Sequence, residues 1–410
     1  MRLTRRPGFS FWRLVFLVLM ASGAVASILR FTRGLGATTN LSDQFPWGLW
    51  VGFDVLCGVG LAAGGFTITA IVYLFNLKRF APIIRPTVLT AFLGYIFVSL
   101  GLIFDLGQPH RIWHALVMWN PHSVMFEVAW CVMLYTTVLA LEFSPIVFER
   151  LNLERPRRIV RAISVPLVIV GVILSTLHQS SLGTLFLIVP EKLHPLWYSP
   201  LLPVFFFVSA IAAGLAMVIV ESYLCQRAFN HSLEMDLLET LGRALVVALS
   251  IYGILRLQDL ARRGMLSALR RPDYESSMFL LEIGLGVLVP IVLLAIPRVR
   301  MTQSGLVTGA ILAVLGFVMH RLNVSVTGME RVAGVRYSPS WIEMAVSLAL
   351  VAAGFAIFGL AVRHLPIFHE VTYRSRMIPA PAWLVPKGTP ALVGHLGSAE
   401  SQSAIHGGSE

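Results

Sequence analysis

The chemistry-bearing residues of this chain are carboxyl, imidazole and phenol groups set within long apolar runs. Asp54, Tyr95, Glu127 and His178 each stand in or at the end of such a run, with Tyr135 as a weaker candidate. An ionisable group inside an apolar span costs at least about 2.5–3.5 kcal/mol at the centre, so its presence requires a reason. A carboxyl group partly removed from water is suited to taking up and releasing protons. We therefore predict a proton-handling site formed by the first four residues.

These side chains must be positioned by helices that cross a membrane. Of the 410 residues, 56% are hydrophobic and 13% are charged, whereas a soluble domain carries about 25% charged residues. A hydrocarbon core about 30 Å thick needs roughly 20 apolar residues in helical form. Ten runs of this kind are present: 9–29, 47–75, 87–106, 123–143, 162–177, 200–221, 239–256, 277–296, 305–321 and 341–363. The predicted fold class is an all-α integral membrane protein with about ten transmembrane helices.

The distribution of basic residues predicts the orientation of these helices. Placing both termini in the cytoplasm puts most of the 32 lysine and arginine residues on that side, as the positive-inside tendency requires. The exception is the loop 256–276, whose five arginines, Arg256 among them, are either balanced by nearby acids or dock an acidic partner. Near Ala24-Val25-Ala26 the first run resembles a signal peptide. Its apolar stretch extends further, which favours a retained helix.

A repeat of nearly constant spacing divides the chain into two halves. Leu61-Ala62-Ala63-Gly64 is echoed by Ile211-Ala212-Ala213-Gly214, and Ser123-x-Met125-Phe126 by Ser276-x-Met278-Phe279. The simplest architecture is two four-helix bundles (helices 2–5 and 6–9), related by an axis along the membrane normal, with helices 1 and 10 beside them. The predicted parts are an N-terminal helix and outer loop (1–46), the first bundle with the proton-handling site (47–199), the second bundle (200–340), the last helix (341–370) and a mobile cytoplasmic tail (371–410).

The composition argues against several other kinds of site. Three cysteines without a C-x-x-C pair do not suit a disulfide framework or a protein-ligated iron–sulfur cluster, and no metal site is predicted. A bis-histidine haem needs histidines on facing helices. The sequence places His178 and His320 at helix ends and no histidine deep in a span, so haem b is not expected. The net charge of +11 lies in short clusters between apolar runs, which reports orientation and not a nucleic-acid partner.

Several segments resemble a known family. Phe45-Pro46-Trp47-Gly48-Leu49-Trp50-Val51-Gly52-Phe53-Asp54, Asn120-Pro121-His122-Ser123-Val124-Met125-Phe126-Glu127 and Leu141-Glu142-Phe143-Ser144-Pro145 resemble the polysulfide reductase membrane-subunit superfamily (NrfD/PsrC). The stretches 178–183 and 192–197 are similar to the HybB-type membrane subunit of uptake nickel–iron hydrogenases. The resemblance covers roughly residues 40–365.

The resemblance implies a subunit that binds a quinone, menaquinone or ubiquinone, near the outer face. Electrons would come from an extracytoplasmic ferredoxin-like iron–sulfur subunit, fed by a catalytic subunit such as a nickel–iron hydrogenase or by a multihaem cytochrome. The family's proton-handling carboxylate, histidine and tyrosine map to Glu127, His178 and Tyr95, with Asp54 as a further polar position. The other residues assigned to the quinone pocket and the proton path are Trp47, Gln179, Asp105, His122, Arg85 and Glu142.

The predicted function is that of a quinone-reactive subunit of a respiratory oxidoreductase in a bacterial or archaeal cytoplasmic membrane. It is an enzyme only as the quinone-reducing or quinone-oxidising part of a complex. Arg85, Tyr95 and Glu142 would continue a polar path toward the cytoplasm and allow proton translocation. The segment Asp105-Leu106-Gly107-Gln108-Pro109 is closer to relatives from sulfur-respiration complexes, which leaves the catalytic partner open.

Three other classes of function stay open: a haem b cytochrome anchor, a secondary transporter and a purely structural anchor. A transporter would need helices broken by Gly or Pro at matching places in both halves, and only the run 47–75 is rich in glycine. A structural anchor gives no reason for Asp54 and Glu127. The small residues of the run 47–75 favour close helix packing, the alternative being a gap for an isoprenoid tail.

Overall fold

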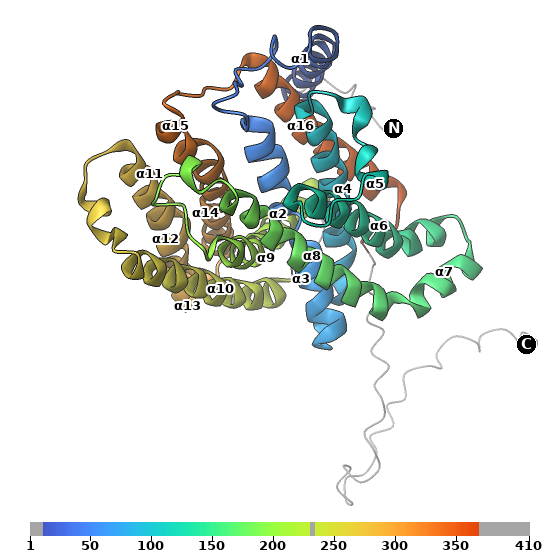
Figure 1. Cartoon of the computed structure of the whole chain (residues 1–410). Helices are drawn as coiled ribbons and strands as arrows, with labels where there is room; N and C mark the ends of the chain where they lie inside the picture. Colours follow the sequence, from blue (N-terminus) through green and yellow to red (C-terminus); the bar gives the residue numbers. More distant parts are fainter. Residues whose placement is uncertain (1–10, 230–233, 369–410) are drawn as a thin grey trace, which may run out of the picture. The chain divides into compact units, whose positions relative to one another are not determined.

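The structure is a computed structural model that describes residues 11–229 and 234–368. The described residues contain helices and no strands, and ten helical segments are long and apolar enough to cross a membrane (Figure 1). All ten predicted spans are confirmed. They are α1 (Phe11–Arg33), a broken span (Trp50–Leu74), Lys78–Asp105 with α4 (Ala81–Asp105), α6 (Val124–Arg150), α8 (Ser164–Leu187), α9 (Leu202–Phe229), α10 (Met235–Arg262), Tyr274–Ala295 with α11 (Tyr274–Ile283) and α12 (Val289–Ala295), Gln303–Ala333 with α14 (Gln303–Leu322) and α15 (Gly328–Ala333), and α16 (Trp341–His364). The predicted tail, 371–410, lies outside the described residues.

Several helices extend well beyond the apolar runs that predicted them. The helix α8 continues to Leu187, so His178 lies inside it and not at its end. The helix α10 continues to Arg262, so Arg256 belongs to a helix and not to the predicted outer loop. The expected positions of His178 and Arg256 were therefore wrong. A hydropathy criterion ends an apolar run where the first polar residues appear. Here the helices continue past that point, because the side chains of both polar residues are buried within the protein.

The second span, Trp50–Leu74, is irregular. It begins as a π-helical segment (Trp50–Cys57), continues as α2 (Gly58–Leu61) and α3 (Gly64–Thr69), and ends as a second π-helical segment (Ala70–Leu74). The wide turns of π-helices occur frequently at functional sites. Here the first π-helical segment carries Asp54 into a buried position.

The two copies of the repeat meet where the small residues are. A Cβ atom placed on Gly214 of α9 would lie 2.6 Å from the backbone nitrogen of Gly64, and one on Gly64 would lie 3.2 Å from the carbonyl oxygen of Gly214. Contact between equivalent residues is what a two-fold axis produces. The contact shows that these glycines permit close helix packing, while the division into bundles at 47–199 and 200–340 stays a prediction.

The packing of the other helices follows the same plan. The broken span, α4, α6 and α8 contact one another in the first half, and α9, α10, α12 and α14 do so in the second. The helix α9 packs against both α8 and the broken span, and so joins the halves. The first and last helices, α1 and α16, pack together, and α16 also contacts α4 (Figure 1). We call the side that carries the loops 34–49, 106–123 and 188–201 the outer side, following the predicted orientation.

Candidate functional site

A cluster of polar side chains lies inside the first half of the chain. Tyr95 of α4, Tyr135 of α6 and His178 of α8 are at most 1% exposed. The centroid of the Tyr95 ring lies 4.7 Å from that of Tyr135 and 5.8 Å from that of His178. Two further buried residues of α8, Ser175 and Gln179, complete the group. We call these five residues the tyrosine–histidine cluster.

Several polar atoms of the tyrosine–histidine cluster are left without a hydrogen-bond partner among the described residues. These atoms are both ring nitrogens of His178 and Oε1 of Gln179, whereas the hydroxyls of Tyr95 and Tyr135 interact with that of Ser175. A buried polar group left unpaired costs about 1–3 kcal/mol, and native proteins keep few of them. Gln179 is anchored to the backbone, because its Nε2 donates to the carbonyl oxygen of Val59 at 3.2 Å. The cluster therefore has several donors and acceptors that a ligand or a proton carrier can use.

Glu127 lies at the outer end of this cluster. The helix α6 begins after Ser123, whose hydroxyl accepts a hydrogen bond from the backbone N–H of Phe126, and Glu127 stands in the first turn. Its Oε1 accepts a hydrogen bond from the Ser181 hydroxyl at 2.6 Å. Ser181 lies one turn after His178 on α8 and is itself buried. Glu127 is exposed at the surface of the chain, and its carboxylate is thus bonded to a buried serine that follows His178 by one helical turn.

Aromatic and apolar side chains surround the exposed position of Glu127. The ring of Trp119 lies 4.8 Å from that of Trp130 and 5.6 Å from that of Phe126, and Nε1 of Trp130 donates to the carbonyl oxygen of Ala115 in α5 (His114–Val117). The exposed apolar side chains beside them are Ile112, Trp113, Leu116, Val117 and Met118. Aromatic side chains gather at membrane–water interfaces. Glu127 therefore opens toward the depth at which lipid headgroups meet the hydrocarbon core.

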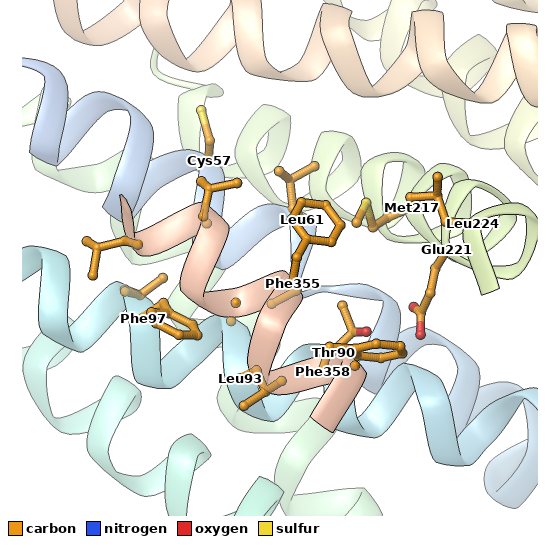
Figure 2. A pocket seen from close by; sticks show the side chains of 18 of the residues that line it. Cys57, Leu61, Thr90, Leu93, Phe97, Met217, Glu221, Leu224, Phe355 and Phe358 are labelled. Atoms are coloured by element: carbon orange, nitrogen blue, oxygen red, sulfur yellow. The ribbon is translucent and has the colours of Figure 1, made fainter. Parts of the chain in front are cut away.

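Asp54 belongs to a different place. It is 8% exposed and accepts a hydrogen bond from the Ser347 hydroxyl of α16 at 2.5 Å. It lines a cavity of about 330 Å³ between the broken span, α4, α9 and α16. Figure 2 shows the mostly apolar lining, with Cys57 and Glu221 toward opposite ends. Both carboxyl oxygens of Glu221 are buried without a hydrogen-bond partner among the described residues.

Small residues shape this cavity, which we call the groove. Gly58, Ala62 and Gly94 line it together with larger apolar side chains such as Leu93 and Phe97. The small residues of the broken span have two roles in the packing. Gly64 permits close contact with α9, and Gly58 borders the groove. The groove and the tyrosine–histidine cluster border the same short stretch of that span, because Gly58 lines the groove and the carbonyl oxygen of the next residue, Val59, accepts the hydrogen bond from Gln179.

A third polar region lies at the inner end of the first half. Arg85, Glu142 and Arg161 line a cavity of about 180 Å³. A Cβ atom placed on Gly171 would lie 3.6 Å from Cε2 of Tyr135 and 3.7 Å from Oε1 of Glu142, so these two side chains flank the same glycine. Tyr135 of the tyrosine–histidine cluster therefore lies close to Glu142 of the inner cavity.

The other predicted site residues lie at the outer end, apart from the tyrosine–histidine cluster. Trp47 is half-buried, with its ring 5.4 Å from that of Phe186. Asp105 ends α4 next to Arg30, whose guanidinium donates to the carbonyl oxygens on either side of Asp105, at 2.8 and 2.7 Å. His122 is exposed.

Two serines of the site, Ser175 and Ser181, were not predicted from the sequence, because a serine inside a helix carries no signal of its own.

The histidines of the two halves belong to separate clusters. His178 lies beside Tyr95, while Nδ1 of His320 lies 2.8 Å from Oε1 of Glu282 and its ring lies 5.9 Å from that of Tyr252. Both histidines are buried. His178 lies well inside α8, which corrects its predicted position at a helix end, while His320 lies in the last turn of α14 as predicted. The two histidines therefore have different surroundings, His178 beside Tyr95 and His320 beside Glu282 and Tyr252.

A family model and several relatives match most of the chain. The family model is described as "Polysulphide reductase, NrfD" and matches residues 37–333. A protein of Nitratidesulfovibrio vulgaris (strain Hildenborough) is 41% identical, over 86% of this chain and 93% of its own length. The "Probable Ni/Fe-hydrogenase 2 b-type cytochrome subunit" of Escherichia coli K12 is 34% identical, over 83% and 88%. The "Menaquinone reductase, integral membrane subunit" of the same Nitratidesulfovibrio strain is 28% identical, over 90% and 94%.

Proposed function

Because the chain belongs to the polysulphide reductase NrfD family of integral membrane proteins, we propose that it is the quinone-reactive subunit of a respiratory oxidoreductase. The relatives' names join a membrane subunit to a hydrogenase or a menaquinone reductase. By the same reasoning, the partners of this chain are an extracytoplasmic ferredoxin-like iron–sulfur subunit and a catalytic subunit such as a nickel–iron hydrogenase. The proposed location is a bacterial or archaeal cytoplasmic membrane, with both termini in the cytoplasm.

The observation that carries this proposal is the set of unpaired polar atoms in the tyrosine–histidine cluster. Reduction of a quinone to a quinol takes two electrons and two protons, and both ring oxygens need hydrogen-bond partners. His178, Tyr95 and Gln179 offer such partners in a buried position. Glu127 exchanges protons with the outer side and passes them through Ser181 toward His178. Uptake or release by short steps of this kind is ordinary general acid–base chemistry.

The groove offers a place for the isoprenoid tail. It is apolar along most of its length and is bordered by α16 (Figure 2). Pockets for such ligands are mostly apolar, with few polar groups. Asp54, bonded to Ser347 near one end, is then a positioning residue at the boundary between tail and headgroup.

Filling the groove should weaken binding of long-tailed quinones only. Leu93 lines the groove, so Leu93→Trp is expected to raise KM for menaquinone about tenfold, equivalent to about 1.4 kcal/mol. A tail-less naphthoquinone should be used with unchanged KM. Leu100→Trp, on the same helix but exposed, is the control. Equal effects on both quinones, or none, would show that the tail lies elsewhere.

The role of Glu127 can be tested without changing the shape of the site. Glu127→Gln keeps the acceptor for Ser181 but cannot exchange a proton, so quinone-linked electron transfer in membranes is expected to fall about 10²-fold. The control is Glu191→Gln, an exposed glutamate of an outer loop. Assembly with the partner subunits is checked by co-purification. Wild-type turnover of an assembled Glu127→Gln complex would remove the assigned role.

The inner cavity extends the proposal to proton translocation. Tyr135 stands between Tyr95 and Glu142, and Glu142 borders the cavity that also contains Arg85 and Arg161. A continuous series of proton-exchanging groups would connect the quinone site with the cytoplasm. Proton release on the two sides of closed vesicles during turnover distinguishes translocation from simple uptake at the outer side.

A further inference from the structure

The second half of the chain encloses a charged cluster that the proposed function does not use. Its members are at most 3% exposed and come from α10, α11 and α14: Tyr252, Arg256, Glu282, His320 and Arg321. Both guanidinium groups interact electrostatically with Glu282, His320 and Tyr252, without a hydrogen bond to Glu282, so the five side chains form one unit. We call it the arginine cluster.

The arginine cluster follows the plan of the tyrosine–histidine cluster. The ring centroids of Tyr252 and His320 are 5.9 Å apart, and those of Tyr95 and His178 are 5.8 Å apart. In each half the tyrosine comes from the second helix and the histidine from the fourth. The two clusters therefore occupy corresponding places in the proposed repeat.

The two clusters differ in the residue that follows the histidine, which is Gln179 in the first half and Arg321 in the second. In the first half Gln179 donates to the carbonyl oxygen of Val59 in the broken span. In the second half Arg321 donates to the carbonyl oxygen of Phe206 in α9 at 3.0 Å. The broken span and α9 are the first helices of their halves. A cation thus stands where the first half has a neutral amide.

The one carboxylate of the arginine cluster is already bonded to other donors. Oε2 of Glu282 accepts from Nε1 of Trp197 at 2.9 Å and from Nδ2 of Asn323 at 2.8 Å, and Oε1 lies 2.8 Å from Nδ1 of His320. Asp259, one turn after Arg256 on α10, accepts two hydrogen bonds from Arg263, at 2.9 and 2.6 Å. Neither carboxylate is therefore committed to a buried arginine.

The arginine cluster retains a set of unused donors. The guanidinium group of Arg256 interacts with the Tyr252 hydroxyl and forms no ion pair or backbone hydrogen bond among the described residues. Nε and one terminal nitrogen of Arg321 and Nε2 of His320 are also left without a hydrogen-bond partner there. Phenyl rings cover the guanidinium groups at 3.7–5.3 Å. Such contacts stabilise a cation by about 2 kcal/mol when desolvated, whereas an uncompensated buried charge costs several kcal/mol.

We propose that the arginine cluster binds one small anion, held between Arg256 and Arg321. Two cations and one carboxylate leave a buried positive charge, and the unused groups on the arginines are all donors. The members are enclosed by protein, so an occupant without a tail fits better than a second quinone. A halide carries a single negative charge and only accepts hydrogen bonds, which suits these groups. The proposal does not depend on the quinone chemistry of the first half.

Chloride is the probe for this site. The purified complex in detergent is expected to melt at least about 2 °C higher in sodium chloride than in sodium gluconate of equal ionic strength, because an occupant that binds only the folded state stabilises it. Soaking with bromide is expected to give an anomalous scattering peak between Arg256 and Arg321. An unchanged melting temperature together with no bromide peak would overturn the proposal and leave internal water as the partner of these donors.

Variants of α10 locate the effect. Arg256→Gln is expected to abolish the chloride-dependent shift, and Arg256→Lys, which keeps the charge, should retain part of it. Arg262→Gln, exposed on the same helix, is the matched control and should behave as the wild type. If Arg256→Gln does not fold, the lysine variant and the bromide peak still decide the outcome. Loss of the shift in the Arg262 variant, or its persistence in a folded Arg256→Gln protein, would contradict the assignment.

Discussion

Replacing His178 by leucine is expected to lower quinone-linked electron transfer by about 10²-fold or more, the usual contribution of a general acid or base. The imidazole is fully buried between Tyr95 and the Ser181–Glu127 pair, and neither of its nitrogens is used by the described residues. Leucine is of similar size, so the helices should still pack. The measurement is quinone reduction in membranes with the physiological electron donor of the complex.

Two controls separate chemistry from folding for this variant. His364→Leu, at the exposed end of α16, should leave the rate unchanged. Reduction of the partner's iron–sulfur clusters should proceed normally in the His178 variant, because only the step to the quinone is affected. A wild-type rate in an assembled His178→Leu complex would mean that the tyrosine–histidine cluster is not the quinone site.

Replacing Gly214 by valine is expected to destabilise the chain by about 3 kcal/mol, at the upper end for overpacking. The new Cβ would lie 2.6 Å from the backbone nitrogen of Gly64 and 2.7 Å from the carbonyl carbon of Ala63. Backbone atoms cannot rotate away as a side chain would, so α9 and the broken span must separate. Thermal unfolding of the purified chain in detergent measures the change.

The matched control for this packing prediction is Gly284→Val. A Cβ at Gly284, also within a span, meets no neighbouring atom within 4 Å. The melting temperature of this control should stay close to that of the wild type. If Gly214→Val is as stable as the control, the two halves are not joined by the contact between equivalent glycines.

The number and type of the helices could be predicted because hydropathy reports lipid contact directly. The ends of the helices could not, because α8 and α10 carry polar residues such as His178 and Arg256 that are buried against protein and not lipid. A single sequence does not distinguish an arginine in a loop from one enclosed by phenyl rings. The repeat was visible because close packing at Gly64 and Gly214 requires the same small residues in both copies.

The candidate site was predicted in part. Tyr95, His178 and Gln179 lie together as expected, and Glu127 reaches them through Ser181. Asp54 was expected beside Glu127 but faces the groove, because the side on which a residue of a π-helical segment projects does not follow the ordinary helical period. The assignment of roles to these residues stays a proposal until the variants are measured.

The irregular second span has a mechanical consequence. Its Asp54–Gly58 side borders the groove, and its Val59 carbonyl fixes the amide beside the buried imidazole. A molecule that enters the groove from the lipid side would contact the same short stretch of backbone that holds Gln179. Occupancy of the groove and the alignment of the proton-exchanging groups would therefore be coupled through residues 58 and 59, without movement of a domain.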